Sequence, residues 1–142
     1  MANNRMGMLA FIVAIASCAT VAASQTGGSQ CKSADSTSVR IDTVLSNLLL
    51  GPDSGYMTMR DSIGIAGVQM SQVSLIADSR TCSRLASALD HLAGVSSSGR
   101  LIYAYSVGNT FAILDPTFLA GDYVQLVFFS SRFKFLLSMD AF

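Results

Sequence analysis

A search for catalytic chemistry starts at His91, the only histidine in the chain. A Ser-His-Asp mechanism would need this residue as its general base, but the sequence has no G-x-S-x-G turn that would present a serine. His91 also falls on the polar side of a predicted helix, near the end where the helix dipole favours a cation. We therefore predict a solvent-exposed structural role for His91, and we assign no catalytic residue.

The carboxylates are a second source of chemistry, and all 9 acidic residues are aspartates. Glycoside-type hydrolysis needs two carboxyl groups held close together. Two pairs fall in predicted loops, Asp53 with Asp61 and Asp115 with Asp122. Asp53 and Asp115 flank prolines and Asp122 follows a glycine, which is typical of turns. A small Asp-dependent hydrolase or isomerase is therefore kept as an alternative function.

Three methionines, Met57, Met59 and Met70, resemble the spaced thioethers that bind Cu(I) in exported copper proteins. Soft sulfur ligands select Cu(I). Methionine also fills irregular cores, however, and no His or Cys lies close to these residues in the sequence. A Met-based Cu(I)-binding protein is the second alternative. The preferred interpretation includes neither a metal site nor a cofactor.

Cys31 and Cys82 are predicted to form a disulfide, because an even pair of cysteines in an exported protein is usually oxidised. Two cysteines and one distant histidine do not make the four-ligand set of a structural zinc site. Closing a loop of this length stabilises a fold by about 4 kcal/mol in the chain-entropy treatment. That is a large share of the ~5–15 kcal/mol that stabilises a whole domain.

Residues 1–24 are predicted to be an export signal. Arg5 is followed by an apolar run over 8–16 and then by small residues, which is the pattern of a secretory signal peptide. The run is shorter than the ~20 residues of a membrane span, so no span is predicted in the mature chain. Cleavage after Ser24 would leave Gln25 first, whereas a lipobox ending at Cys18 would leave a lipidated cysteine. The chain is thus predicted to be periplasmic or extracellular, or alternatively to be a membrane-anchored lipoprotein.

The remaining chain is predicted to form one domain over residues 33–142, close to the common domain size. Residues 25–32 precede it as a flexible lead-in rich in Gly, Ser and Gln. The formal net charge of the whole chain is +0 at pH 7, and no basic stripe runs along it. Nucleic acid is therefore not a predicted partner.

Hydrophobic periodicity predicts two helices in this domain, over 33–50 and 79–94. A strand is predicted at 73–77 and hairpins at 101–115 and 123–139, while 52–67 is mostly an irregular connection. The order α-β-α-β-β-β-β predicts an α+β domain with both helices on one face of a mostly antiparallel sheet of about four to five strands. In shape, and without a shared motif, this order resembles the small modules of cystatin-like and PepSY-type exported proteins.

Turn chemistry predicts how the strands of each hairpin pair. Gly108 and Asn109 suit a two-residue turn in the first hairpin, which places Tyr103 opposite Leu114.

The last hairpin is predicted to turn at Ser130 and Ser131, with Phe128 opposite Phe133. One of its faces is then apolar and predicted to be core, and a one-residue slip would place Lys134 within that core. The other face combines aromatic, aliphatic and basic side chains, which suits a partner. This predicted partner surface consists of Phe129, Arg132, Lys134 and Leu136. The alternative is an ordinary sheet face that the loop over 116–122 partly covers.

The absence of a coherent catalytic set in the sequence favours one function over the two alternatives. We expect a small exported non-enzymatic domain of the binding, inhibitory or structural kind. Its partner would be a protein or another component of the cell envelope.

Overall fold

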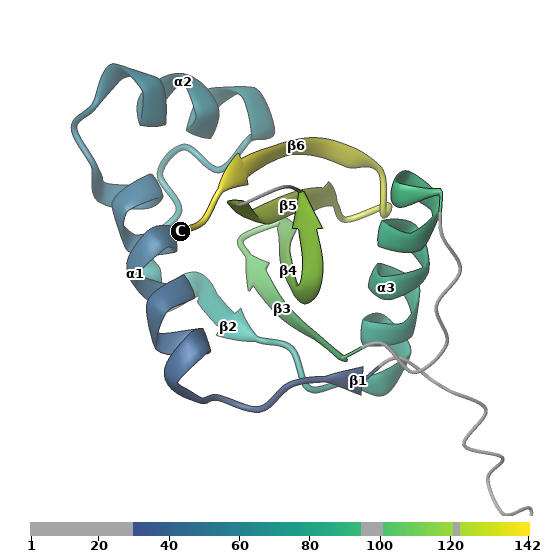
Figure 1. Ribbon diagram of the computed structural model, residues 1–142. Helices are drawn as coiled ribbons and strands as arrows, with labels where there is room; N and C mark the ends of the chain where they lie inside the picture. The colour runs from purple at the N-terminus through teal and green to yellow at the C-terminus, as the bar shows by residue number, and fades with distance from the viewer. Residues whose placement is uncertain (1–29, 95–100, 121–122) are drawn as a thin grey trace, which may run out of the picture.

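The computed structural model describes residues 30–94, 101–120 and 123–142 (Figure 1). The predicted export segment, Cys18 and Asp122 lie outside the described residues, as does most of the lead-in. None of the helices within those ranges combines the length and apolar character needed to cross a membrane.

The predicted α+β class with an antiparallel sheet is confirmed. Strands β2 to β6 pair antiparallel in the order β2-β3-β4-β5-β6, and the short β1 pairs parallel with the start of β3. The elements in chain order are β1 (Gln30–Cys31), α1 (Ser36–Leu50), α2 (Ser54–Ile63), the 3-10 helix η1 (Met70–Gln72), β2 (Val73–Leu75), α3 (Ser79–Ala93), β3 (Leu101–Val107), β4 (Thr110–Ala120), β5 (Tyr123–Ser130) and β6 (Phe135–Asp140).

Helix α1 begins at a reciprocal cap. The Oδ1 of Asp35 accepts hydrogen bonds from the backbone N–H groups of Thr37 (2.9 Å) and Ser38 (3.0 Å). In return, the Ser38 hydroxyl oxygen accepts from the Asp35 N–H at 2.7 Å. These bonds satisfy N–H groups that have no partner within the helix.

Helix α2 occupies most of the segment that we predicted to be irregular, so that prediction is wrong for 54–63. Asp53 caps it by accepting from the Gly55 N–H at 2.7 Å, and Gly64 ends it with a φ of 74°. Only one of its side chains, Ile63, is buried. Its residues are less apolar on average than those of α1, and the turn residues Pro52 and Gly64 on either side of it favoured an irregular connection.

Arg60 fastens α2 to the end of α1. Its Nη1 donates to the carbonyl oxygens of Leu48 (2.9 Å), Leu49 (3.1 Å) and Gly51 (2.9 Å). The last carbonyls of a helix lack intrahelical partners and carry partial negative charge, so a guanidinium satisfies and stabilises them.

The second predicted helix and the disulfide are both confirmed. Asp78 caps α3 by accepting from the Thr81 N–H at 2.8 Å, and Gly94 closes it with a φ of 67°. The Cys31–Cys82 bond joins β1 to the first turn of α3, with the two Cα atoms 5.6 Å apart. Because β1 pairs with β3, the bond attaches α3 to the sheet.

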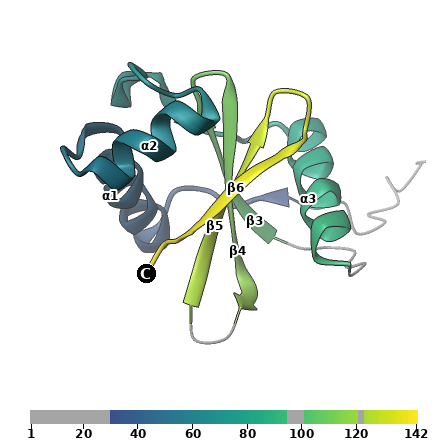
Figure 2. The same ribbon diagram turned by 90° about the horizontal axis from the view of Figure 1, so that it is seen from above.

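The helices cover opposite faces of the sheet, so the prediction that they share one face is wrong (Figure 2). Successive side chains of a strand point to opposite faces. Phe128 and its neighbour Phe129 are 0% and 1% exposed, so both faces of the central strands must be covered. The resulting domain has three layers, with the sheet in the middle.

Each face has its own core. The α1 core lies beneath α1 and α2 and consists of Ile41, Leu45, Leu48, Leu49, Ile63, Ile65, Tyr103, Tyr105, Val107, Ala112, Leu114, Leu126 and Phe128. The α3 core lies beneath α3 and consists of Leu85, Ala86, Leu89, Ile102, Ala104, Ile113, Val127 and Phe129.

The first hairpin has the predicted register, with Tyr103 opposite Leu114. Gly108 lies at its turn with a φ of 58°, a conformation that glycine adopts without strain.

The last hairpin turns later than predicted, and its predicted register is wrong. The N–H of Phe133 donates to the Ser130 carbonyl, and the Ser130 N–H donates to the Lys134 carbonyl, both at 2.8 Å. This is the bonding of a three-residue loop in which the third residue is left-handed, and Phe133 has a φ of 60°. Phe129 then pairs with Phe135, and a β-bulge between Phe129 and Phe128 places Phe128 opposite Leu137.

Candidate functional site

The fold divides the predicted partner surface. Arg132 and Lys134 are exposed near the tip of the last hairpin, as expected. Phe129 is buried in the α3 core, and Leu136 is half-buried against the α1 core. The expectation that all four share an exposed face is therefore wrong, and the two cations are the members that a partner could reach.

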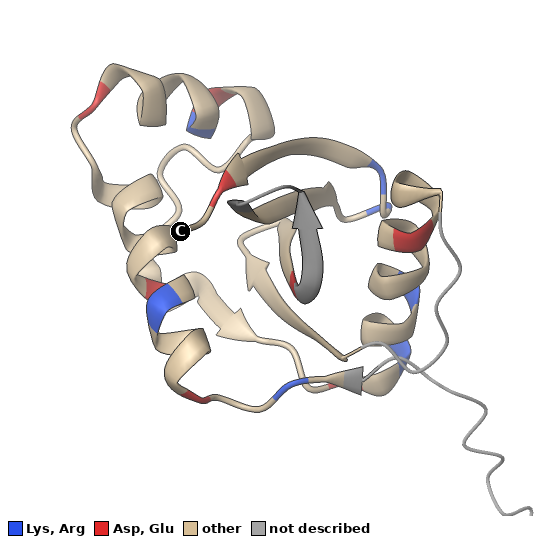
Figure 3. Ribbon diagram, in the orientation of Figure 1, with Lys and Arg blue, Asp and Glu red and all other residues tan. Residues whose placement is uncertain are grey.

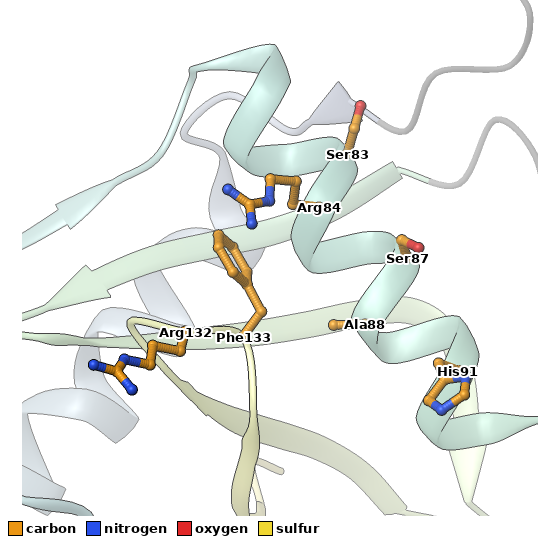
Figure 4. A pocket seen from close by; sticks show the side chains of 7 residues that line it. All are labelled: Ser83, Arg84, Ser87, Ala88, His91, Arg132 and Phe133. Atoms are coloured by element: carbon orange, nitrogen blue, oxygen red, sulfur yellow. The ribbon is translucent and has the colours of Figure 1, made fainter.

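A hollow of about 500 Å³ lies between α3 and the tip of the last hairpin (Figure 4). Helix α3 contributes two rows of side chains spaced four residues apart, which places each row along one side of the helix. We call this site the α3 hollow. It is lined by Ser83, Arg84, Ser87, Ala88, His91, Arg132 and Phe133.

A stack of three side chains forms the wall of the α3 hollow. The guanidinium carbon of Arg84 lies 4.2 Å from the centre of the Phe133 ring. The Phe133 ring in turn stacks on Phe111 of β4, with centroids 5.4 Å apart and an interplanar angle of 20°. Figure 4 shows Arg84 and Phe133 pointing toward one another, whereas Arg132 extends away from α3. Arg84 thus packs against a stacked pair of aromatic rings, and Arg132 forms the outer rim.

The backbone of Phe133 is unusual for its residue type. A bulky residue with positive φ is an outlier, because its Cβ crowds the neighbouring carbonyl at a cost of roughly 1–2 kcal/mol. The third position of this loop type normally has glycine. Here the ring contacts Arg84 and Phe111, so the side chain compensates for the strained backbone and sets the shape of the hollow.

The α3 hollow is electropositive although the chain as a whole is neutral. None of its seven lining residues is acidic, and two of them are arginines. Figure 3 shows further basic positions on α3 and at the start of β6 on this side of the molecule. Asp90 of α3 is half-buried and does not line the hollow. A ligand with negative charge would therefore find complementary charge here.

His91 lies at the end of the α3 hollow, exposed on the polar side of α3, which agrees with the predicted structural placement. Ser83 and Ser87 are also exposed there, and no lining residue is a carboxylate that could orient the imidazole. The Ser-His-Asp arrangement is therefore not assembled at this site.

A second hollow of about 310 Å³, the α1 hollow, lies beside α1, η1 and β2. The Tyr105 hydroxyl donates to the Ser38 carbonyl at 3.2 Å. Burial, together with the nearby Asp42 carboxylate, raises the pKa of Tyr105 well above its usual 10.0. The residues that line the hollow are Ala34, Ser38, Asp42, Met70, Val73, Ser74, Leu75 and Tyr105.

Asp35 lies at the start of α1 and receives a hydrogen bond from across the domain. The Tyr103 hydroxyl donates to its Oδ2 at 2.5 Å. This bond, followed by the one from the Ser38 N–H, holds the pKa of Asp35 below 3.8. Donors that favour the charged form of a carboxyl lower its pKa in this way.

The aspartate pairs considered in the sequence are not brought together where the structure describes them. Asp53 caps α2, and Asp61 is exposed on the same helix. Eight residues of helix separate them by about 12 Å. Asp115 is buried on β4, and its counterpart at 122 lies outside the described residues.

The three methionines also fall in different surroundings. Met57 and Met59 are two positions apart on α2, and side chains with that spacing do not face each other. Met57 is 50% exposed, whereas Met59 and Met70 pack against the α1 core. Over residues 30–94, 101–120 and 123–142, no three His, Cys, Asp or Glu side chains gather as a metal-binding group.

Known proteins provide no assignment for this site. No protein-family model, no curated protein and no solved structure matches the chain.

Sequence reasoning missed Arg84 and Phe133 as site residues. Arg84 falls on the polar side of the helix predicted over 79–94, where a solvated charge is the ordinary interpretation. Phe133 was placed in the core because the turn was positioned too early. The run Ser130-Ser131-Arg132 has no glycine or asparagine to mark a left-handed residue, so turn chemistry could not have found the loop.

Proposed function

We propose that this chain is a small exported, non-enzymatic binding domain whose partner occupies the α3 hollow. The observation that carries the proposal is the stack of Arg84 on Phe133 at an open hollow. Arginine and aromatic side chains are enriched where proteins bind one another. An inhibitory or structural role of the same face would use the same contact.

The proposed location is outside the cytoplasm. The Cys31–Cys82 disulfide is consistent with an oxidising compartment. The mass of the protein purified from the cell that makes it tests the two routes. A free or cyclised Gln25 at the N-terminus supports ordinary signal cleavage, and an acylated Cys18 supports a lipoprotein. A full-length product would contradict both.

Site-directed photo-cross-linking tests the binding function. A photoreactive residue is placed at Ser87, which is exposed in the α3 hollow, and at Thr43, which is exposed on α1 as a matched control. In the exporting cell we expect one discrete product from Ser87 and none from Thr43. Equal cross-linking at the two positions would contradict a partner site in the α3 hollow.

One observation favours the enzymatic alternative, which we propose as the second candidate. Asp42 and Tyr105 line the same α1 hollow, between a helix and the sheet. A raised pKa keeps the Tyr105 hydroxyl protonated, so it would act as a donor and Asp42 as the base. Turnover of ester or glycoside substrates that Asp42→Asn abolishes would support this candidate, and turnover that survives the substitution would oppose it.

A further inference from the structure

The charge and shape of the α3 hollow define a class of ligand, and this inference rests on the binding function proposed above. We infer that the α3 hollow binds an extended acidic segment of a partner protein, with carboxylates placed against Arg84 and Arg132. The inference depends on three features of the site: its donors, its length and its charge.

The donors are available because of what Arg84 contacts. A phenylalanine ring has no lone pair. Phe133 therefore holds the Arg84 guanidinium without accepting a conventional hydrogen bond from its N–H groups. The planar guanidinium presents its donors in a fork that matches a carboxylate. The ring therefore restricts the orientation of Arg84 before a ligand arrives, which reduces the entropy lost on binding.

The length of the hollow suits a short stretch of extended chain. Lining residues run along α3 from Ser83 to His91, and eight residues of helix span about 12 Å. An extended peptide advances about 3.3 Å per residue, so three to four ligand residues match that length. Ser87 of this row adds a hydroxyl group that can donate to a peptide carbonyl.

The charge of the hollow selects against neutral and basic segments. Arg84 and Arg132 are both exposed, and no carboxylate lines the hollow to neutralise them. A basic ligand would place like charges together, whereas an acidic one would gain attraction at each arginine. Because both arginines are solvent-exposed, each should contribute only modestly to the affinity.

The test uses the folded, oxidised domain and the peptide acetyl-Asp-Asp-Asp-Asp-amide, followed by ¹⁵N–¹H NMR shifts at low salt. We expect saturable shifts centred on 83–91 and 132–133. Each of Arg84→Gln and Arg132→Gln should weaken binding by up to about fivefold. The matched control is Arg40→Gln, because Arg40 also lies over an aromatic ring, Phe142 at 3.9 Å, but on α1. Arg40→Gln should leave binding unchanged.

Three results would overturn the inference: no shifts in the α3 hollow, an equal loss of affinity in Arg40→Gln, or inorganic phosphate producing the same shifts at the same concentration. The last would define a general oxyanion site. The inference of an acidic ligand can fail independently of the proposed binding function. A Ser87 cross-link that persists in the Arg84→Gln, Arg132→Gln double variant would keep the binding function and reject the acidic ligand. Peptide binding without a Ser87 cross-link would keep the acidic ligand and reject the proposed binding function.

Discussion

The two faces of the sheet are covered in different ways. Among the residues that the structure describes, the α1 core has 13 buried members and the α3 core has 8. Polar side chains reinforce the larger layer, through Arg60 at the end of α1 and Tyr103 at its start. A disulfide holds the smaller layer to the sheet. A covalent bond thus compensates for a smaller apolar area, because it stabilises α3 without requiring more of its surface to be buried.

This difference has a consequence for function. Helix α3 packs on the sheet with one side, and its other side carries the side chains that line the α3 hollow. Helix α1 contributes more of its surface to packing and to contacts with α2. The proposed binding site therefore lies on the face that is held by the disulfide.

The largest expected effects test whether both faces are true cores. Phe128→Ala and Phe129→Ala should each lower the free energy of unfolding by about 3–5 kcal/mol, since each removes a buried ring. Phe135→Ala is the matched control, because Phe135 is 47% exposed, and it should cost about 1 kcal/mol. Urea unfolding with the disulfide intact measures all three. If Phe129→Ala resembled Phe135→Ala, the α3 side would not be a core.

Removing the disulfide should affect the two faces unequally. The double variant Cys31→Ala, Cys82→Ala should lose about 4 kcal/mol of stability, because the bond closes a long loop across a sequence separation of 51. Hydrogen exchange should then show a greater loss of protection in α3 than in α1, since α3 rests on the smaller core. An equal loss of protection in α1 and α3 would contradict the proposal that the disulfide mainly stabilises the α3 side.

Local sequence signals predicted those parts of the fold that depend on local chemistry. The predicted bounds of 79–94 match helix α3, which Asp78 caps and Gly94 ends, and the Gly108-Asn109 turn determined the pairing of β3 with β4. The face that each helix covers could not be predicted in the same way. The central strands are apolar on both sides, as Phe128 and Phe129 show, so their pattern does not indicate which side receives which helix.

The candidate site was less predictable than the fold, because it depends on one unexpected turn. Its cations were partly identified, since Arg132 was expected at the surface near the hairpin tip. The Phe133 ring that supports Arg84 was not identified, because Phe133 reaches Arg84 only from a left-handed backbone that a phenylalanine rarely adopts. Such a position becomes visible only when tertiary packing is known.

The strain at Phe133 gives a smaller and more specific test of the α3 side. Phe133→Gly and Phe133→Ala both remove the contacts with Arg84 and Phe111. Glycine also relieves the left-handed backbone, so Phe133→Gly should be the more stable of the two by about 1 kcal/mol, after the added flexibility of its unfolded chain is subtracted. Chemical denaturation of the pair measures the difference. An alanine variant as stable as the glycine variant would show that the backbone is not strained.

The smallest expected effect compares the helix caps of the two faces. The pKa of Asp35 is held below 3.8 first by the Tyr103 hydroxyl, and that of Asp78 first by the Thr81 side chain. A lowered pKa in the folded state means that the ionised carboxyl stabilises the fold above 3.8 and that this contribution disappears as the pH falls through the folded-state pKa. Asp35→Asn keeps the cap but removes the ionisation, so its melting temperature should decline less steeply in acid.

Only the Asp35 cap depends on a donor from the sheet, and Tyr103→Phe removes that donor without changing the cap itself. The pKa of Asp35 should then rise toward its ordinary value, while that of Asp78 stays where it is, because Asp78 takes its hydrogen bonds from its own helix. Carbon-13 NMR titration of the two carboxyl groups reads each site separately. A rise at both sites would indicate a general loss of structure, and no rise at Asp35 would show that α1 is not joined to the sheet by this bond.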